Sequence, residues 1–151
     1  MDAIPIHLSE LMVIEINVHP VVELGTDRRY VPFGDGSFVG ADGLQGTLQP
    51  GGIDWQRIRV DGTVEIDAHY VLRTEDDDLI EVRSTGVRRV PEAVAVRIAA
   101  GEEVSADEYY FRTHVTLATS STRWERLNGI LAISTGLRER DTVRIHIHEL
   151  R

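Results

Sequence analysis

The segment Gly51-Gly52-Ile53-Asp54-Trp55 combines residue types that suit acid–base chemistry. The two glycines allow a sharp turn or a close approach of the backbone to a ligand. Asp54 is a candidate general base. Trp55 beside it could wall an apolar pocket, raise the pKa of the aspartate and stack on an aromatic substrate. The structural alternative is a turn whose aspartate bonds local amides and whose tryptophan fills the core.

The strand predicted over residues 63–73 supplies three further catalytic candidates. Asp67 and His69 share one face by the two-residue period of a strand, and Tyr70 lies on the other face. If the polar face lines a ligand cavity, Asp67 and His69 form an acid–base pair. The alternative is a solvent-facing or structural pairing, because the polar face of a soluble antiparallel sheet usually meets water. Tyr70 is a candidate proton donor.

The segment Tyr109-Tyr110-Phe111-Arg112-Thr113 has the same two-sided character. Its apolar face, which carries Tyr109 and Phe111, is predicted to be core. Tyr110 is a candidate proton donor, and Arg112 could hold a carboxylate or an enolate oxygen. The alternative for Arg112 is a structural ion pair.

The candidate substrate-binding residues are Trp55, Trp124, Asn128, Phe38 and Arg83. Trp124 and Asn128 lie four residues apart, so they could cap a barrel end and supply an amide to the ligand. A tryptophan buried in the core is the alternative reading.

Metal and cofactor sites are not predicted. His146 and His148 point the same way on a strand, but Glu149 points to the opposite face, and two exposed edge histidines are the preferred interpretation. The chain has no cysteine, which excludes thiolate ligands and nucleophiles. It also lacks a phosphate-binding loop and a nucleophile elbow.

Glycine and proline recur at short intervals, as is typical of many short antiparallel strands. Gly34-Asp35-Gly36 is predicted to be a tight turn and residues 91–100 to be the single helix. The expected strands cover residues 11–18, 29–33, 37–39, 44–48, 53–60, 63–73, 79–88, 109–118, 127–134 and 143–150.

A sheet of this length closes or folds on itself to remove its edges, so we predict an all-β antiparallel closed barrel of about 8–10 strands with one short helix. A β-sandwich is the structural alternative. Residues 1–151 are expected to form a single domain. The net charge of −9 argues against nucleic acid and anionic membranes as partners. No membrane-spanning run or secretory signal stands out, and we expect a cytoplasmic protein.

Several segments resemble a known family in order and spacing. The most specific are Gly51-Gly52-Ile53-Asp54-Trp55 and Tyr109-Tyr110-Phe111-Arg112-Thr113, and further similarity lies in residues 36–40, 44–48, 67–74, 86–88 and 124–128. The chain resembles the bacterial and fungal proteins grouped as domain-of-unknown-function family 3237. The resemblance implies a lipocalin-like (calycin-type) barrel and no family-wide reaction. In the family the last strand usually ends with one aromatic residue, whereas this chain has two histidines there.

These features favour a cofactor-independent enzyme that acts on a small carbonyl compound, aromatic or polyketide-like, by dehydration, isomerisation or cyclisation. Asp54 or Asp67 would be the base, with Tyr70, Tyr110 or His69 as the donor. One alternative is a non-catalytic barrel that binds a small molecule. A second alternative is a structural module that forms homo-oligomers.

Overall fold

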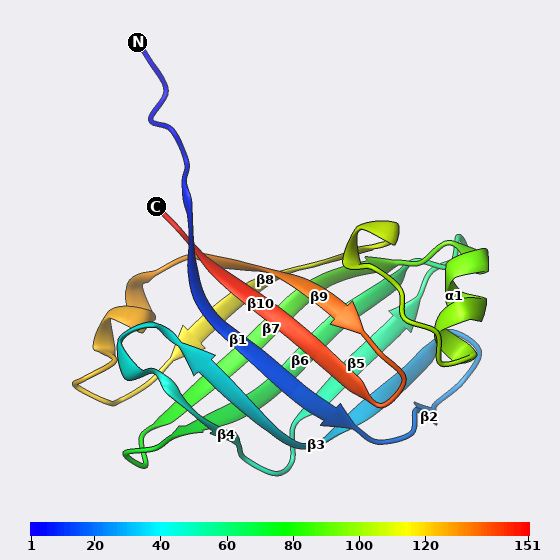
Figure 1. The fold of residues 1–151 in the computed structure, drawn as a ribbon, viewed down its shortest axis with the longest axis horizontal. Coiled ribbons are helices and arrows are strands. Elements are labelled where there is room, and N and C mark those ends of the chain that lie inside the picture. The colour runs from blue at the N-terminus through cyan, green and yellow to red at the C-terminus, as the bar shows by residue number, and fades with distance from the viewer.

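The computed structural model describes residues 1–151 as one continuous antiparallel sheet that closes on itself (Figure 1). Closure occurs at β1, which pairs with β10 on one side and with β3 on the other. The strands are β1 (Leu8–Val18), β2 (Val22–Glu23), β3 (Arg28–Gly40), β4 (Gln45–Leu48), β5 (Ile53–Ile58), β6 (Val64–Thr74), β7 (Leu79–Arg89), β8 (Tyr110–Ala118), β9 (Ala132–Arg138) and β10 (Thr142–Leu150).

The result is a closed barrel of eight strands with two extra strands and one helix, α1 (Glu92–Ala99). β4 and β5 both lie between β3 and β6, and each pairs with a different stretch of those two long strands. β2 is a short strand that pairs only with β3. Three short 3₁₀ turns, η1 (Ala41–Gly43), η2 (Ala106–Glu108) and η3 (Glu125–Gly129), complete the chain. The predicted all-β barrel with a single short helix is confirmed. No helix has the length and apolar character needed to span a membrane.

Alternation of apolar and polar side chains decides which face of each strand is buried. In β6 the apolar residues at every second position are buried inside the barrel, and the residues between them are more exposed. This is the period-2 pattern of a sheet with one face on the core. The inward set of β6 is Val64, Ile66, Ala68, Tyr70 and Leu72.

Two local predictions are wrong. Gly34-Asp35-Gly36 is not a turn, because it lies within the continuous 13-residue strand β3. A Cβ atom on Gly36 would collide with the carbonyl oxygen of Glu15, so this glycine permits two strands to approach closely. The strand expected over residues 127–134 begins only at Ala132, because the preceding residues form η3.

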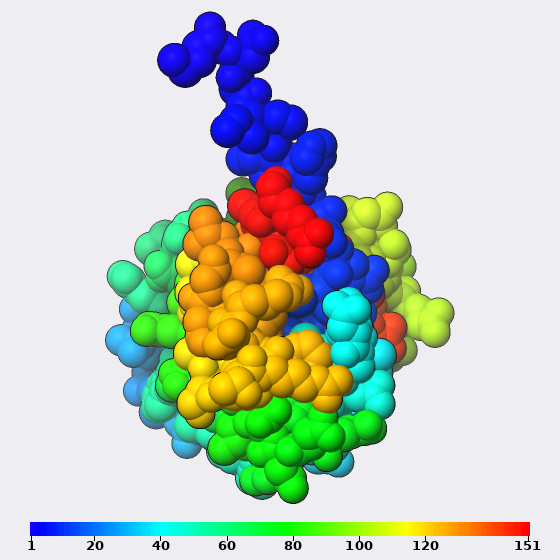
Figure 2. Space-filling view, turned by 90° about the vertical axis from the view of Figure 1, so that its left-hand side faces the viewer, coloured from blue at the N-terminus to red at the C-terminus, as the bar shows by residue number.

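The two ends of the barrel differ. At one end, which we call the closed end, η1 and η3 lie side by side across the opening (Figure 2). The interior beneath them is packed with apolar side chains, among them Phe38, Leu72, Ile80, Val82 and Leu127, each less than 2% exposed. The opposite end, which we call the open end, lies next to α1 and β2 (Figure 1). The fold therefore leaves space for a ligand in one half of the barrel only.

Candidate functional site

A cavity occupies the open end of the barrel, with a volume of about 590 Å³ when the part open to solvent is included. The part that the centre of a water-sized sphere can reach is about 60 Å³, which is room for a few water molecules. Eleven of its eighteen lining residues are hydrophobic: Ile16, Val18, Val21, Val31, Phe33, Ile66, Ala68, Tyr70, Phe111, Val143 and Ile145. The polar lining residues are Arg29, Asp54, Gln56, Ser84, Arg88, Thr113 and Arg138.

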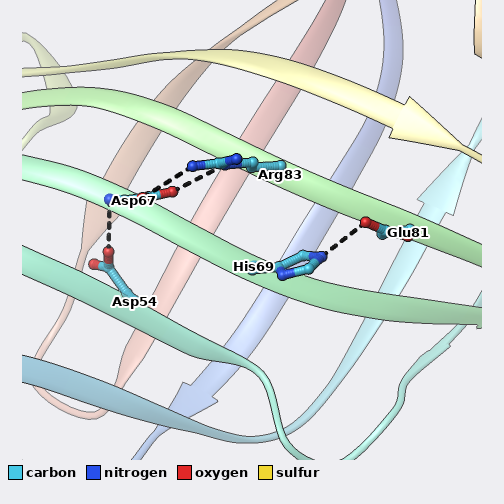
Figure 3. A network of polar contacts seen from close by, with 5 residues as sticks. All are labelled: Asp54, Asp67, His69, Glu81 and Arg83. Carbon is cyan, nitrogen blue, oxygen red and sulfur yellow. Dashed lines mark hydrogen bonds and ion pairs between the residues drawn. The ribbon is translucent and has the colours of Figure 1, made fainter.

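Asp54 projects from β5 into this cavity and is 7% exposed. Gln56, two residues further along the same strand, donates from Nε2 to Asp54 Oδ2 at 2.6 Å. Arg29 in turn donates from Nε to Gln56 Oε1 at 2.8 Å. The backbone N–H of Asp67 donates to Asp54 Oδ1 at 3.2 Å (Figure 3). Each carboxylate oxygen keeps a lone pair for a ligand, because a carboxylate offers about four acceptor sites.

Burial raises the pKa of Asp54 from 3.8 to about 6. The hydrogen bond from Gln56, the charge of Arg88 and the Asp67 amide oppose this rise without cancelling it. A carboxyl group with this pKa is mostly ionised at neutral pH, yet it accepts a proton readily. This is the property that a general base requires.

The raised pKa of Asp54 predicts a pH-dependent stability. Between about pH 4 and pH 6 the folded protein still holds the proton that the unfolded chain has lost, so the free energy of unfolding falls as the pH rises. Relative to Asp54→Asn, we expect the wild type to lose about 2–3 kcal/mol between about pH 4 and pH 7. Urea unfolding of both proteins across this range measures the difference. A difference that is constant with pH would contradict the raised pKa.

Tyr70 reaches the same cavity from β6. Its ring packs edge-on against Phe33 with 5.4 Å between the ring centroids. Burial and the negative charge of Asp54 both raise the pKa of the Tyr70 phenol, so it stays protonated. No hydrogen bond within the protein acts on its hydroxyl, which faces the cavity and is free to donate to a ligand.

Three arginines, Arg29, Arg88 and Arg138, also line the cavity, and we call them the arginine cluster. They come from β3, β7 and β9. The Arg88 guanidinium lies 5.7 Å from the centre of the Phe111 ring. Burial and the charges of Arg138 and Arg29 lower the pKa of Arg88 to about 10. The cavity therefore combines one carboxylate and one phenol with a concentration of positive charge.

A layer of hydroxyl groups marks the inner limit of the cavity. Thr113 bridges Ser84 at 2.6 Å and Ser134 at 2.5 Å, joining β7, β8 and β9. Ser84 and Thr113 line the cavity, whereas the next inward residues, Val82 and Val115, belong to the packed core. Every buried hydroxyl in this layer is paired, which removes the cost of burying it alone.

Comparison with known proteins places this geometry in a family. The family of proteins of unknown function DUF3237 matches residues 6–150. The chain belongs to this family. It is 29% identical to a UPF0311 protein of Clostridium acetobutylicum over 147 residues, which are 94% of this chain and 92% of the relative. It is 32% identical to a UPF0311 protein of Rhodopseudomonas palustris over 129 residues, which are 85% and 84% of the two chains.

Solved structures of similar chains carry the same barrel. A protein of unknown function from R. palustris superposes with a TM-score of 0.91 at 27% identity and covers 99% of this chain and 100% of its own. A β-barrel-like protein from Acinetobacter baumannii gives a TM-score of 0.83 at 31% identity, with 99% of each chain covered. A chain described as an enzyme from Penicillium herquei gives 0.72 at 20% identity, with 100% and 98% covered, and shares the fold.

In this DUF3237 member, two of the predicted catalytic residues, Asp54 and Tyr70, line the same cavity. Asp67 and His69 do not, because they lie on the outer face of β6. Asp67 receives two hydrogen bonds from Arg83 at 3.2 Å, and His69 is 2.9 Å from Glu81 (Figure 3). The structure thus favours the solvent-facing alternative for this pair. It also places Arg83, a predicted substrate-binding residue, outside the barrel.

Tyr110 and Arg112 also lie on the outer face. Tyr110 is 42% exposed, and the Arg112 guanidinium lies over its ring with 5.2 Å to the centroid. Their neighbours Tyr109 and Phe111 are buried, as the alternation predicts. Arg112 therefore does not reach the cavity, and the cationic side chains that line it are those of the arginine cluster.

The aromatic residues predicted to shape the pocket lie elsewhere. Trp55 follows Asp54 on β5 and so faces the opposite way; it is 44% exposed and packs on Tyr30 with 4.9 Å between ring centroids. Phe38 and Trp124 are buried among the core residues of the closed end. Asn128 is exposed and exchanges hydrogen bonds with the backbone of Thr119. None of the four contacts the cavity.

The histidines of β10 make no metal cluster. His146 and His148 are half-buried on the outer face. Glu149 points to the other face, where Arg126 and Arg151 donate to its carboxylate. No group of three or more histidine, cysteine, aspartate or glutamate side chains lies close enough to hold a metal ion.

The sequence did contain a signal for the residues that the prediction missed. Each arginine of the cluster continues the inward-facing alternation of its strand: Arg88 follows Ile80, Val82 and Ser84 at two-residue steps. Gln56 shares the inward face with Asp54 in the same way. A polar residue in register with a buried face, near a strand end, is therefore the pattern that locates this site.

Proposed function

We propose that this protein is an acid–base enzyme of the lyase or isomerase/cyclase type, acting on a small carbonyl compound in the open end of the barrel. One observation carries the proposal. Asp54, a buried carboxylate with a pKa of about 6, lines the same largely apolar cavity as the free phenol of Tyr70. Paired titratable groups with separated pKa values are the mark of acid and base roles.

In the proposed reaction, Asp54 removes a proton from the carbon next to the carbonyl group. The C–H electron pair becomes a C=C bond, and the carbonyl π electrons move onto oxygen as an enolate. Tyr70 donates a hydrogen bond to this oxygen, and nearby guanidinium charge stabilises it. When a second C=C bond is conjugated with the enolate, the resulting dienolate takes the proton back at its γ carbon, which is isomerisation; when the β carbon carries a leaving group, the enolate expels it with its bonding pair, which is elimination.

The surrounding residues hold the base in one orientation. Gln56 and Arg29 form a hydrogen-bonded chain that fixes one carboxylate oxygen, and the Asp67 amide fixes the other. Such positioning matters because a base must lie within hydrogen-bond reach of its proton, about 2.6–3.2 Å. The apolar walls exclude water and so strengthen these electrostatic effects.

A non-catalytic ligand-binding barrel is the second candidate, and the hydrophobic lining favours it. Eleven apolar residues around the cavity suffice to hold a small molecule without any chemistry. The fungal protein described as an enzyme shares this fold at 20% identity. The fold alone therefore suits both candidates, and the difference between them lies in what Asp54 does.

Exchange of protons into deuterated water tests the proposal directly. A panel of small aryl ketones and enones is incubated with the protein in D₂O, and loss of the proton next to the carbonyl is followed by NMR. We expect exchange with at least one compound, at a rate that rises through about pH 6 and then stays level, because Asp54 ionises there and Tyr70 remains protonated. Ligands that bind without any exchange would favour the binding barrel.

A further inference from the structure

The arginine cluster gives the cavity an excess of positive charge. Among the residues that line the interior cavity, Arg29, Arg88 and Arg138 accompany a single acidic residue, Asp54, so this lining has a net charge of +2. The protein as a whole has a net charge of −9. The positive charge of the cavity is therefore opposite in sign to the net charge of the protein, so the overall composition does not account for it.

The cluster also lacks the ion pairs that the surface arginines make. Arg57, Arg83 and Arg144, like most arginines of the surface, lie within 4.0 Å of a carboxylate, whereas no arginine of the cluster does. Arg88 makes no hydrogen bond, and the Arg138 guanidinium reaches only the carbonyl oxygen of Arg140, at 3.4 Å. The three side chains are half-buried, and apart from the bond from Arg29 to Gln56 their guanidinium groups have donors available to a partner from outside the chain.

The arginine cluster lies at the entrance to the interior cavity. A second hollow outside the barrel runs between helix α1 and the β9–β10 turn, with Ile98 and Glu139 among its lining residues. It shares all three arginines with the interior cavity. A molecule inside the barrel therefore passes or contacts the guanidinium groups.

We infer that the ligand is an organic anion, whose apolar body lies inside the barrel and whose anionic oxygen group lies at the mouth against Arg88, Arg29 and Arg138. This rests on the proposed function only in placing the ligand body beside Asp54 and Tyr70. A guanidinium group binds a carboxylate through two parallel hydrogen bonds, and such bonds are about twice as strong as neutral ones. Carboxylates and phosphate esters share this chemistry.

Binding of matched probes tests this inference. Benzoate and benzamide have the same ring and similar shape, but only benzoate is charged. By titration calorimetry we expect benzoate to bind the wild type about tenfold more tightly than benzamide, a difference of about 1.4 kcal/mol. The preference should shrink as salt is added. Equal affinity for the two probes would overturn the inference. Phenyl phosphate is the third probe: tighter binding than benzoate would assign the anionic group to a phosphate ester.

Two arginine variants test whether the preference for benzoate comes from the arginine cluster. Arg88→Met keeps an apolar stem but removes the charge, and we expect it to lose the benzoate preference while still binding benzamide. Arg112→Met is the matched control, because Arg112 lies outside the barrel. An unchanged preference in Arg88→Met would overturn the assignment to the cluster. Retained benzamide binding shows that the variant is folded.

The outcomes separate this inference from the proposed function. Anion preference without any proton exchange leaves the inference standing and removes the enzyme. Exchange that proceeds equally well with neutral and anionic ketones leaves the enzyme and overturns the inference. Asp54→Asn should bind benzoate at least as tightly as the wild type, because it removes a negative charge that faces the same cavity.

Discussion

Replacing Asp54 with asparagine is expected to lower the rate of proton exchange by about 10²–10⁴-fold. Asparagine has nearly the same size but cannot accept the proton, so the catalytic step loses its base. The affinity for ketone ligands should change little, since the cavity wall keeps its shape. Exchange rates measured at saturating ligand, together with dissociation constants from calorimetry, separate these two effects.

Asp67→Asn is the matched control for this variant. The Asp67 side chain pairs with Arg83 on the outer face, while its contact with Asp54 comes from the backbone amide, which the substitution retains. Full exchange activity is therefore expected in Asp67→Asn. Activity in Asp54→Asn within a factor of about two of the wild type would remove Asp54 as the base.

Phe38→Ala is expected to lower the free energy of unfolding by about 3–5 kcal/mol. Phe38 is 1% exposed in the packed core of the closed end, so its removal leaves a cavity that its neighbours fill only in part. The sequence suggested that Phe38 binds substrate, but the structure places it away from the cavity. Ligand affinity of the folded variant should therefore equal that of the wild type. Urea unfolding and calorimetry measure the two quantities.

The neighbouring residue provides the control for Phe38. Val39 points outward from the same strand and is 62% exposed. We expect Val39→Ala to change stability by less than about 0.5 kcal/mol. A loss of ligand binding in folded Phe38→Ala would contradict the separation of the packed core from the ligand cavity.

The general fold could be predicted because alternation in the chain is strong. The inward and outward sets of β6 and β8 follow directly from the period of two, and glycine and proline mark the ends of β2 to β4. The error at Gly34-Asp35-Gly36 has a physical reason. A glycine that allows two strands to approach and a glycine that allows a turn look the same in sequence, and only the partner strand distinguishes them.

The site was harder to predict because it depends on which face of each strand turns inward. Asp54 and Trp55 are adjacent on a strand and face opposite sides, so only one of them can line the cavity. The sequence nevertheless suggested that Trp55 forms the pocket wall beside Asp54. The arginine cluster was missed because arginine at a strand end normally faces solvent. Arg88 lies 59 residues after Arg29 and 50 residues before Arg138, and only the closure of the barrel brings the three together.

Because only one half of the barrel is packed, the two ends of a single strand have different roles. β7 places Ile80 and Val82 in the closed end and Arg88 at the mouth. Substitutions at the mouth therefore leave the side-chain contacts of the packed half intact. The protein should therefore tolerate substitutions at the open end, where the ligand binds. Variants with new ligand preferences can then be selected from libraries that vary only the open-end half of each strand.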